Sequence, residues 1–254
     1  YFCNSKSIYM SINSKLGKLY LIPCTLSNPG EVTVNPDDVL PQTIKRCIEL
    51  IDYYIVENEK TARKAIKAIL PEKLQPSLQL SLLNKHTEVS EHYEMIKPLL
   101  NGINVGLMSE AGCPGVADPG AVIVKLAHEK GIQVVPLVGP SSILLALMAS
   151  GMNGQSFAFT GYLPIDKNEK KSALRNLEKW SQEKNQAQIF METPYRNNKF
   201  LEDILGTLHP QTNLCVACDI TLPTEFIKTK TVNDWKKQKV DLHNRPCIFV
   251  IQKS

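Results

Sequence analysis

Two loops rich in small residues hold the side chains that are best placed for chemistry. The first runs from Ser109 to Gly120 and contains two acids, Glu110 and Asp118, and three glycines. The second is the tetrapeptide Gly-Pro-Ser-Ser at 139–142. Each loop follows a strand-like run, and ligands of open parallel sheets bind in loops beyond the carboxyl ends of the strands. Glycine also lets the backbone approach a ligand closely. The two loops together predict a ligand site.

The composition of these loops indicates which ligand they would take. Neither G-x-x-x-x-G-K-[ST] nor G-x-G-x-x-G occurs, and no lysine in either loop could neutralise a polyphosphate. A cationic ligand, or a nucleotide with little phosphate, fits better, and S-adenosylmethionine with its positive sulfonium is such a ligand. We expect no metal. Cys215 and Cys218 form a CxxC inside an apolar strand without a second ligand pair, which indicates buried structural cysteines.

Charge gives a weaker indication of a nucleic-acid partner. The formal net charge of +4 permits such a partner but does not demand one. Basic residues at i, i+4 spacing form one stripe on an expected helix: Lys167, Lys171, Arg175 and Lys179. The stripe is either a solvated helix face or a contact for an RNA backbone. No aromatic residue interleaves with these lysines as a base-stacking platform would.

Composition excludes two broad classes of protein. A hydrophobic content of 43% and a charged content of 21% are globular values, so the chain is not disordered. The longest apolar runs are about half of the ~20 residues that a bilayer span needs, which argues against a membrane protein. Seven scattered cysteines, an odd number, do not form a disulfide framework. They predict a reducing, cytoplasmic location.

Strand-like and helix-like runs alternate along the first half of the chain, which predicts an α/β fold with a mostly parallel sheet. The expected strands there are 18–23, 51–57, 78–83, 103–109 and 132–138. In the second half we expect a buried helix at 141–150, a lysine-rich helix at 167–184, and strands at 156–164, 187–192, 213–220, 225–231 and 246–252, of which 225–231 is antiparallel. We predict an extension at 1–17 and two α/β domains, 18–138 and 139–254. Residues 1–9 are a tag, an extension or a truncated start, with Met10 as a candidate initiator.

Five segments carry a resemblance to a known family: LYLIPCTLSNPGEVT (19–33), SEAGCPGVADPG (109–120), VVPLVGPSSILLALMASG (134–151), FAFTGYLP (157–164) and FMETPYR (190–196). In this order and spacing they resemble the tetrapyrrole methylase superfamily of S-adenosylmethionine-dependent methyltransferases. The sequence is most similar to the branch that 2′-O-methylates a cytidine of 16S ribosomal RNA. The resemblance implies two α/β domains, a cofactor in the cleft between them, and a homodimer.

The resemblance also implies which residues contact the cofactor. By motif these are Pro23, Thr25, Ala111, Gly112, Cys113, Val116, Ser141, Ser142, Glu192 and Ile220, and Glu110 is a further candidate for holding the cofactor's ammonium group. Cys113 stands where the corrin-type enzymes carry Asp, which argues against a tetrapyrrole substrate. Departures from the ribosomal RNA branch cluster where substrate would bind, among them Thr25 in place of Pro. The chain also ends without the short basic extension that many members carry.

The leading hypothesis is methyl transfer to an RNA ribose hydroxyl. A nearby acid–base group would help such a weak nucleophile. The candidates for this role are Glu57, His86, Glu88, Glu110 and Asp118. Arg196 would hold a phosphate, and Lys171 and Arg175 would contact the RNA backbone. Two alternatives stay open: the same chemistry on a small molecule or another RNA, and a non-catalytic protein that keeps the fold. A cofactor pocket filled by side chains would favour the last.

Overall fold

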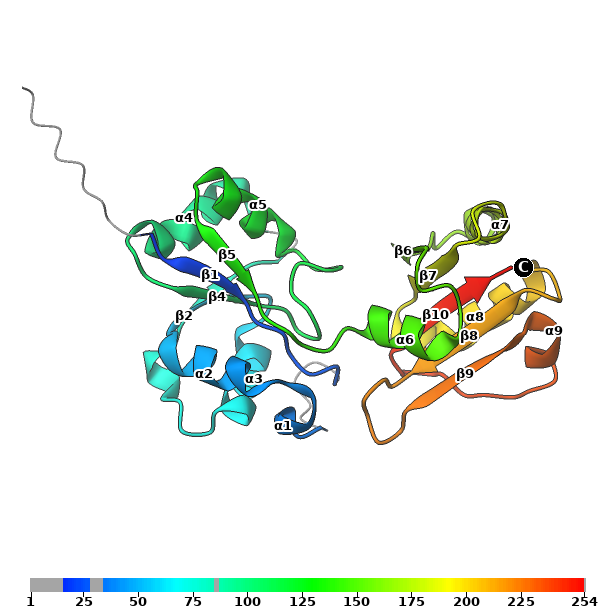
Figure 1. Cartoon of the computed structure of the whole chain (residues 1–254), viewed down its shortest axis with the longest axis horizontal. Coiled ribbons are helices and arrows are strands. Elements are labelled where there is room, and N and C mark those ends of the chain that lie inside the picture. Colours follow the sequence, from blue (N-terminus) through cyan, green and yellow to red (C-terminus); the bar gives the residue numbers. More distant parts are fainter. Residues whose placement is uncertain (1–15, 28–33, 85–86, 254) are drawn as a thin grey trace, which may run out of the picture.

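The computed structural model describes residues 16–27, 34–84 and 87–253, and these form two five-stranded sheets (Figure 1). The first sheet has the order β3-β2-β4-β1-β5 and the second the order β6-β7-β10-β8-β9. Each sheet is built from consecutive strands of one half of the chain. The predicted boundary near Gly139 lies between the last strand of the first sheet and the first strand of the second.

The first sheet is parallel throughout, as the strand–helix alternation predicts. Its strands are β1 (Lys18–Leu21), β2 (Tyr53–Val56), β3 (Gln79–Leu82), β4 (Val105–Met108) and β5 (Gln133–Pro136). Its helices are α1 (Pro36–Val39), α2 (Gln42–Leu50), α3 (Glu59–Ile69), α4 (Val89–Leu100) and α5 (Ala121–Glu129), with a 3-10 turn η1 (Gln75–Ser77). One apolar core packs under α2 and α3 and another under α4 and α5. Crossover helices therefore cover both faces of the sheet.

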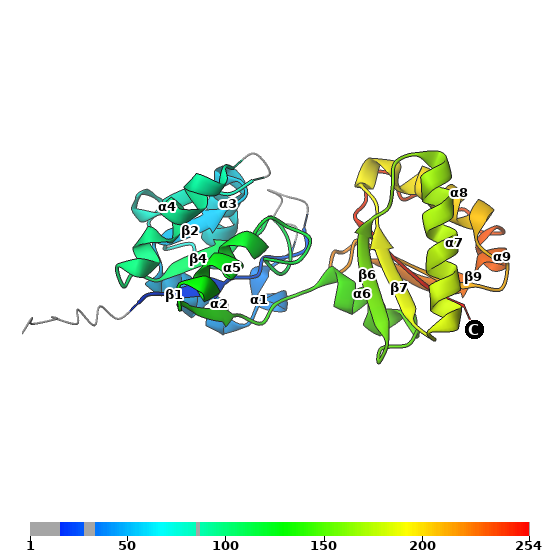
Figure 2. The same cartoon turned by 90° about the horizontal axis from the view of Figure 1, so that it is seen from above.

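The second sheet is mixed. Its strands are β6 (Phe157–Tyr162), β7 (Ala187–Met191), β8 (Asn213–Cys218), β9 (Phe226–Thr231) and β10 (Cys247–Gln252). Only β6 and β7 pair in parallel, and β9 pairs antiparallel with β8 as predicted. Its helices are α6 (Ser142–Ser150), α7 (Lys167–Glu183), α8 (Asn197–Thr207) and α9 (Val232–Trp235), with a 3-10 turn η2 (Pro194–Arg196). The lysine-rich α7 runs alongside β6 and β7 (Figure 2).

The structure differs from the sequence prediction at five helices. The prediction did not include the four-residue helices α1 and α9, nor α2 and α8, whose apolar residues are spaced among many polar ones. Helix α6 was expected to be buried, and this is wrong for one side: Leu144 is half exposed and Met148 is 77% exposed. The helix is apolar around most of its circumference, so its sequence could not show which side would face the sheet.

Candidate functional site

Three loops that follow strands of the first sheet interlock at its carboxyl edge. The amide of Cys24 donates to the carbonyl of Gly112 over 2.9 Å, which joins the first loop to the second. The thiol of Cys113 donates to the carbonyl of Pro140 over 3.4 Å, which joins the second loop to the third. Close packing adds to these bonds, because a Cβ on Gly139 would lie only 2.2 Å from the Cβ of Pro23. The loops thus form one rigid wall.

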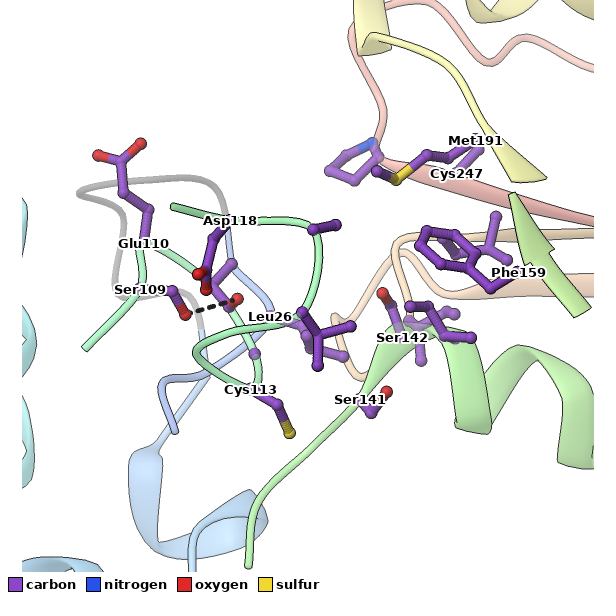
Figure 3. A pocket seen from close by; sticks show the side chains of 18 of the residues that line it. Leu26, Ser109, Glu110, Cys113, Asp118, Ser141, Ser142, Phe159, Met191 and Cys247 are labelled. Carbon is purple, nitrogen blue, oxygen red and sulfur yellow. Dashed lines mark hydrogen bonds between the residues drawn. The ribbon is translucent and has the colours of Figure 1, made fainter. Parts of the chain in front are cut away.

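This wall faces the second sheet across a cavity of about 360 Å³ (Figure 3). The first-half lining is Leu26, Ser27, Glu57, Ser109, Glu110, Ala111, Gly112, Cys113, Val116, Ala117 and Asp118. The later lining is Ser141, Ser142, Ile143, Phe159, Tyr162, Met191, Glu192, Pro194, Ala217, Ile220, Pro246, Cys247 and Ile248. The volume falls within the range of small-molecule sites, which begins near ~300 Å³. A cavity filled by side chains would favour a non-catalytic protein that keeps the fold. Side chains do not fill this cavity, so the structure does not favour that alternative.

Three carboxylates gather at the first-half side of the cavity. Glu57 and Glu110 are 53 residues apart, yet Oε1 of Glu57 accepts the amide of Glu110 over 3.1 Å. Burial raises the pKa of Glu57, and the charges of Asp118 and Glu110 raise it further against the lowering effect of that hydrogen bond. Glu57, Glu110 and Asp118 also line an adjoining cavity of about 590 Å³. This side of the site therefore attracts cations.

The three acids are not equivalent in their contacts. Both carboxylate oxygens of Asp118 accept the amide of Gly115 over 2.8 Å, and Oδ1 also accepts the amide of Gly120 over 2.7 Å. Asp118 thus holds its own loop together. Oε1 of Glu110 accepts the hydroxyl of Thr61 over 3.2 Å, and its carboxylate points away from the cavity side of Ser141 and Ser142 (Figure 3). Gly112 has a positive φ of 69°, and a Cβ there would meet Leu26 rather than open space.

The opposite side of the cavity carries one acid that is neutralised. The side chain of Glu192 is only 2% exposed, and its Oε1 accepts Nη2 of Arg196 over 2.7 Å. The amide and hydroxyl of Thr193 donate to the same oxygen. Among the described residues that line the cavity there is no lysine or arginine. A ligand with a positive centre and a neutral nucleoside therefore suits this cavity better than a polyphosphate.

The structure brings most of the predicted site residues together. Of the predicted cofactor contacts, Glu110, Ala111, Gly112, Cys113, Val116, Ser141, Ser142, Glu192 and Ile220 line the cavity. Pro23 and Thr25 do not line it and instead support the loops that do. Of the predicted acid–base residues, Glu57, Glu110 and Asp118 line it.

Other predicted residues lie elsewhere. Glu88 is exposed at the N-cap of α4, where it forms a capping box with Glu91, a structural use of its carboxylate. His86 lies outside the described residues. Lys171 and Arg175 are exposed on α7 and do not line the cavity. Arg196 reaches the cavity through Glu192.

Sequence reasoning missed the apolar side of the cavity. Phe159, Met191 and Cys247 come from three strands of the second sheet, and only their pairing brings them side by side (Figure 3). Phe159 and Met191 lie within the family-like segments 157–164 and 190–196, which was their one sequence signal, and Cys247 lies in none of these segments. In the described part of the chain, no group of three or more histidine, cysteine or acidic residues is arranged to hold a metal ion.

Comparison with known proteins defines the class. The family model described as Tetrapyrrole (Corrin/Porphyrin) Methylases matches residues 18–235. The chain therefore belongs to this family and is an S-adenosylmethionine-dependent methyltransferase. No helix in the described ranges has the length and apolar content that a bilayer span requires.

Curated relatives agree with this membership, and solved structures share the fold. The chain is 30% identical over 210 residues to ribosomal RNA small subunit methyltransferase I of Vibrio cholerae, covering 83% of this chain and 67% of that protein. It is 26% identical to the protein of the same name from Escherichia coli O157:H7, covering 96% and 80%. A structure of diphthine synthase matches with a TM-score of 0.62 at 13% identity, covering 93% and 90%. A Thermus thermophilus uroporphyrin-III C-methyltransferase complexed with S-adenosylhomocysteine matches with a TM-score of 0.54 at 16% identity, covering 93% and 98%.

Proposed function

We propose that the chain transfers the methyl group of S-adenosylmethionine to the 2′-hydroxyl of a ribose in small-subunit ribosomal RNA. The observation that carries the cofactor part is the open cavity between the two halves, with three carboxylates on one side and no lining lysine or arginine among the described residues. The acceptor is supported by the curated relatives, which are named as ribosomal RNA small subunit methyltransferases.

The residues of the cavity fit this cofactor chemically. Bound S-adenosylmethionine supplies an electrophilic methyl group on a positively charged sulfur. The interlocked loops around Gly112 and Ser141 would hold the cofactor, and the carboxylates would favour its positive centres. Methyl transfer is an in-line displacement that depends mainly on alignment and exclusion of water. A rigid wall therefore suits the reaction.

A general base for the ribose hydroxyl would come from the same acidic side. Asp118 is occupied by the amides of its own loop, and Glu110 is turned toward Thr61. Glu57 uses one oxygen for the amide of Glu110, and its raised pKa brings it nearer to neutral pH. Glu57 is thus the best placed of the predicted candidates to accept the hydroxyl proton.

Assembly and location complete the proposal. Two copies would associate as a homodimer, which the family resemblance and the exposed apolar side of α6 support. The protein would work in a reducing cytoplasm, which agrees with six free cysteines among the described residues.

The test is a transfer assay with tritiated cofactor. The purified chain is incubated with 30S subunits or total RNA, and the labelled nucleoside is identified after digestion. We expect label in a 2′-O-methylated nucleoside. Ala111→Trp, which places an indole at the cavity lining, should abolish transfer. Ala121→Trp, an exposed alanine that does not line the cavity, should leave it intact.

Two outcomes would contradict the proposal in different ways. Cofactor binding in calorimetry without any label in RNA would point to a small-molecule acceptor. If calorimetry shows no binding of S-adenosylmethionine at millimolar concentration, this cavity is not the site of the methyltransferase reaction.

A further inference from the structure

Two exposed tyrosines lie beside the cavity on the side away from the carboxylates. Tyr162 is the last residue of β6, lines the cavity and is 57% exposed. Tyr195 lies in η2 directly after Pro194, another lining residue, and is 60% exposed. An aromatic ring with this much exposure gains little from the protein core. The stability of the fold therefore does not explain why two tyrosines are exposed here.

An irregularity in β6 directs Tyr162 toward the cavity. Residues three apart on a regular strand point to opposite faces, yet Phe159 and Tyr162 both line the cavity. The pairing of β6 with β7 shifts register between these two residues, and Gly161 has a positive φ of 70°. A bulge of this kind re-aims side chains and is common beside active sites.

Arg196 lies between the ring of Tyr195 and Glu192 in the cavity lining. Its guanidinium carbon lies 5.2 Å from the centroid of the Tyr195 ring. The hydrogen bond to Glu192, a lining residue, raises the pKa of Arg196. Tyr162 lies on the same side of the cavity, because it pairs with Met191 and both line the cavity. The Nε atom of Arg196 is buried without a hydrogen-bond partner among the described residues. The cluster thus combines two aromatic rings with a fixed cation.

We propose that Tyr162, Tyr195 and Arg196 form a stacking platform for the unpaired nucleotides next to the methylated ribose. This inference rests on the proposed function. Single-stranded RNA is recognised by stacking of splayed bases on aromatic rings and arginine planes. The acidic side of the site would repel the phosphates that follow the target nucleotide. The strand therefore passes over the tyrosine side, with the ribose turned into the cavity.

The test measures binding of a short fluorescein-labelled single-stranded RNA by anisotropy. Tyr195→Ala and Tyr162→Ala should each weaken binding on the order of ten-fold or more, because stacking on the ring is lost. Tyr195→Phe and Tyr162→Phe keep the ring and should restore affinity. Tyr93→Ala is the matched control: this tyrosine is 43% exposed on α4 and does not line the cavity. Arg196 is kept intact, because its removal would leave Glu192 buried and unpaired.

Two further readouts separate stacking from other roles. The affinity of Tyr195→Ala for S-adenosylmethionine, measured by calorimetry, should equal that of the wild type. The salt dependence of RNA binding should keep its slope, since no phosphate contact is lost. A loss of cofactor affinity equal to the loss of RNA affinity would overturn the platform.

Failure of the platform is distinguishable from failure of the proposed function. If the wild type methylates RNA and the alanine variants bind RNA as well as it does, the platform is wrong and the methyltransferase proposal stands. If the wild type neither binds nor methylates RNA, the proposed acceptor is wrong, and the platform falls with it.

Discussion

At the scale of single residues, Glu57 is a carboxylate whose environment disfavours its charge. Burial and two neighbouring acids raise its pKa. A carboxyl group with a raised pKa in the folded state stabilises the fold at acidic pH, and that contribution is lost as the pH rises through the folded-state pKa. At neutral pH the charged form therefore costs stability.

The raised pKa of Glu57 predicts that removing its charge stabilises the fold at neutral pH. Glu57→Gln should raise the melting temperature at neutral pH, because the amide keeps the acceptor for the Glu110 amide and carries no charge. The gain should vanish as the pH falls below ~4.5, where the wild-type carboxyl is protonated in both states. Thermal scans at several pH values measure this. Glu49→Gln, at an exposed position, should show no such trend, and a gain that persists at acidic pH would contradict the assignment.

Asp118 supports a second prediction, which separates a structural role from a catalytic one. Asp118→Asn keeps Oδ1, which accepts both the Gly115 and Gly120 amides. The rate of transfer at saturating cofactor should stay near the wild type, and cofactor affinity should fall only slightly, because one of the three carboxylates loses its charge. Asp118→Ala removes both bonds and should weaken cofactor binding while lowering the melting temperature. Calorimetry and the transfer assay decide. A loss of rate on the order of 10²-fold in Asp118→Asn, with normal cofactor affinity, would mark Asp118 as the base instead.

At the scale of elements, α3 illustrates how a local cap carries stability. The side-chain oxygen of Asn58 accepts the amides of Lys60 and Thr61 over 2.9 and 3.2 Å. Asn58→Ala should therefore lower the free energy of unfolding by about 1 kcal/mol. Asn58→Ser, which offers an equivalent acceptor, should recover most of it. Denaturant titration of both variants is the measurement, and an unchanged midpoint in Asn58→Ala would show that the cap is not needed.

Helix α7 is the element on which the RNA hypothesis can be tested apart from the cavity. Its buried side is formed by Leu174 and Leu177, and Lys171 and Arg175 are exposed. Reversing both to Glu should weaken RNA binding and flatten its salt dependence, because fewer counterions are released. Lys67→Glu with Lys125→Glu, also exposed, makes the same change of charge in the first half of the chain. If both double variants behave alike, the α7 stripe is a solvated face.

At the scale of the whole molecule, the two sheets lie on either side of α6 (Figures 1 and 2). Residues of both halves line one cavity. Each half supplies its own apolar core. The lining comes from both halves, so a bound ligand contacts both sheets. Helix α6 lies at this junction and leaves an apolar side exposed.

The last prediction concerns assembly through that side of α6. Light scattering should give a mass near twice 28.4 kDa at micromolar concentration. Leu144→Glu with Met148→Glu should shift the mass toward one copy, since two charges would have to be buried at the contact. Leu50→Glu changes an exposed leucine of α2 and should leave the mass unchanged. A wild-type mass of 28.4 kDa would contradict the homodimer.

The sequence by itself determined the strands of both sheets and the loops of the site. Runs such as Val105–Met108 are short and apolar. A pattern of this kind indicates a strand, and it depends only on residues that are neighbours in the chain. The loop at 109–120 was found for the same reason, since its glycines and acids are adjacent in the chain. The order of the five segments was enough to indicate the family, which the match over residues 18–235 confirms.

Tertiary structure alone decided which of these residues meet. Glu57 contacts the backbone of Glu110 only because β2 and β4 are neighbours in the sheet. Tyr162 and Met191 line the same cavity because β6 pairs with β7, and a bulge in β6 brings Tyr162 to the side of Phe159. The exposed side of α6 depends on where the second sheet lies. These contacts join residues far apart in the chain, and burial and pKa depend on such neighbours rather than on local pattern.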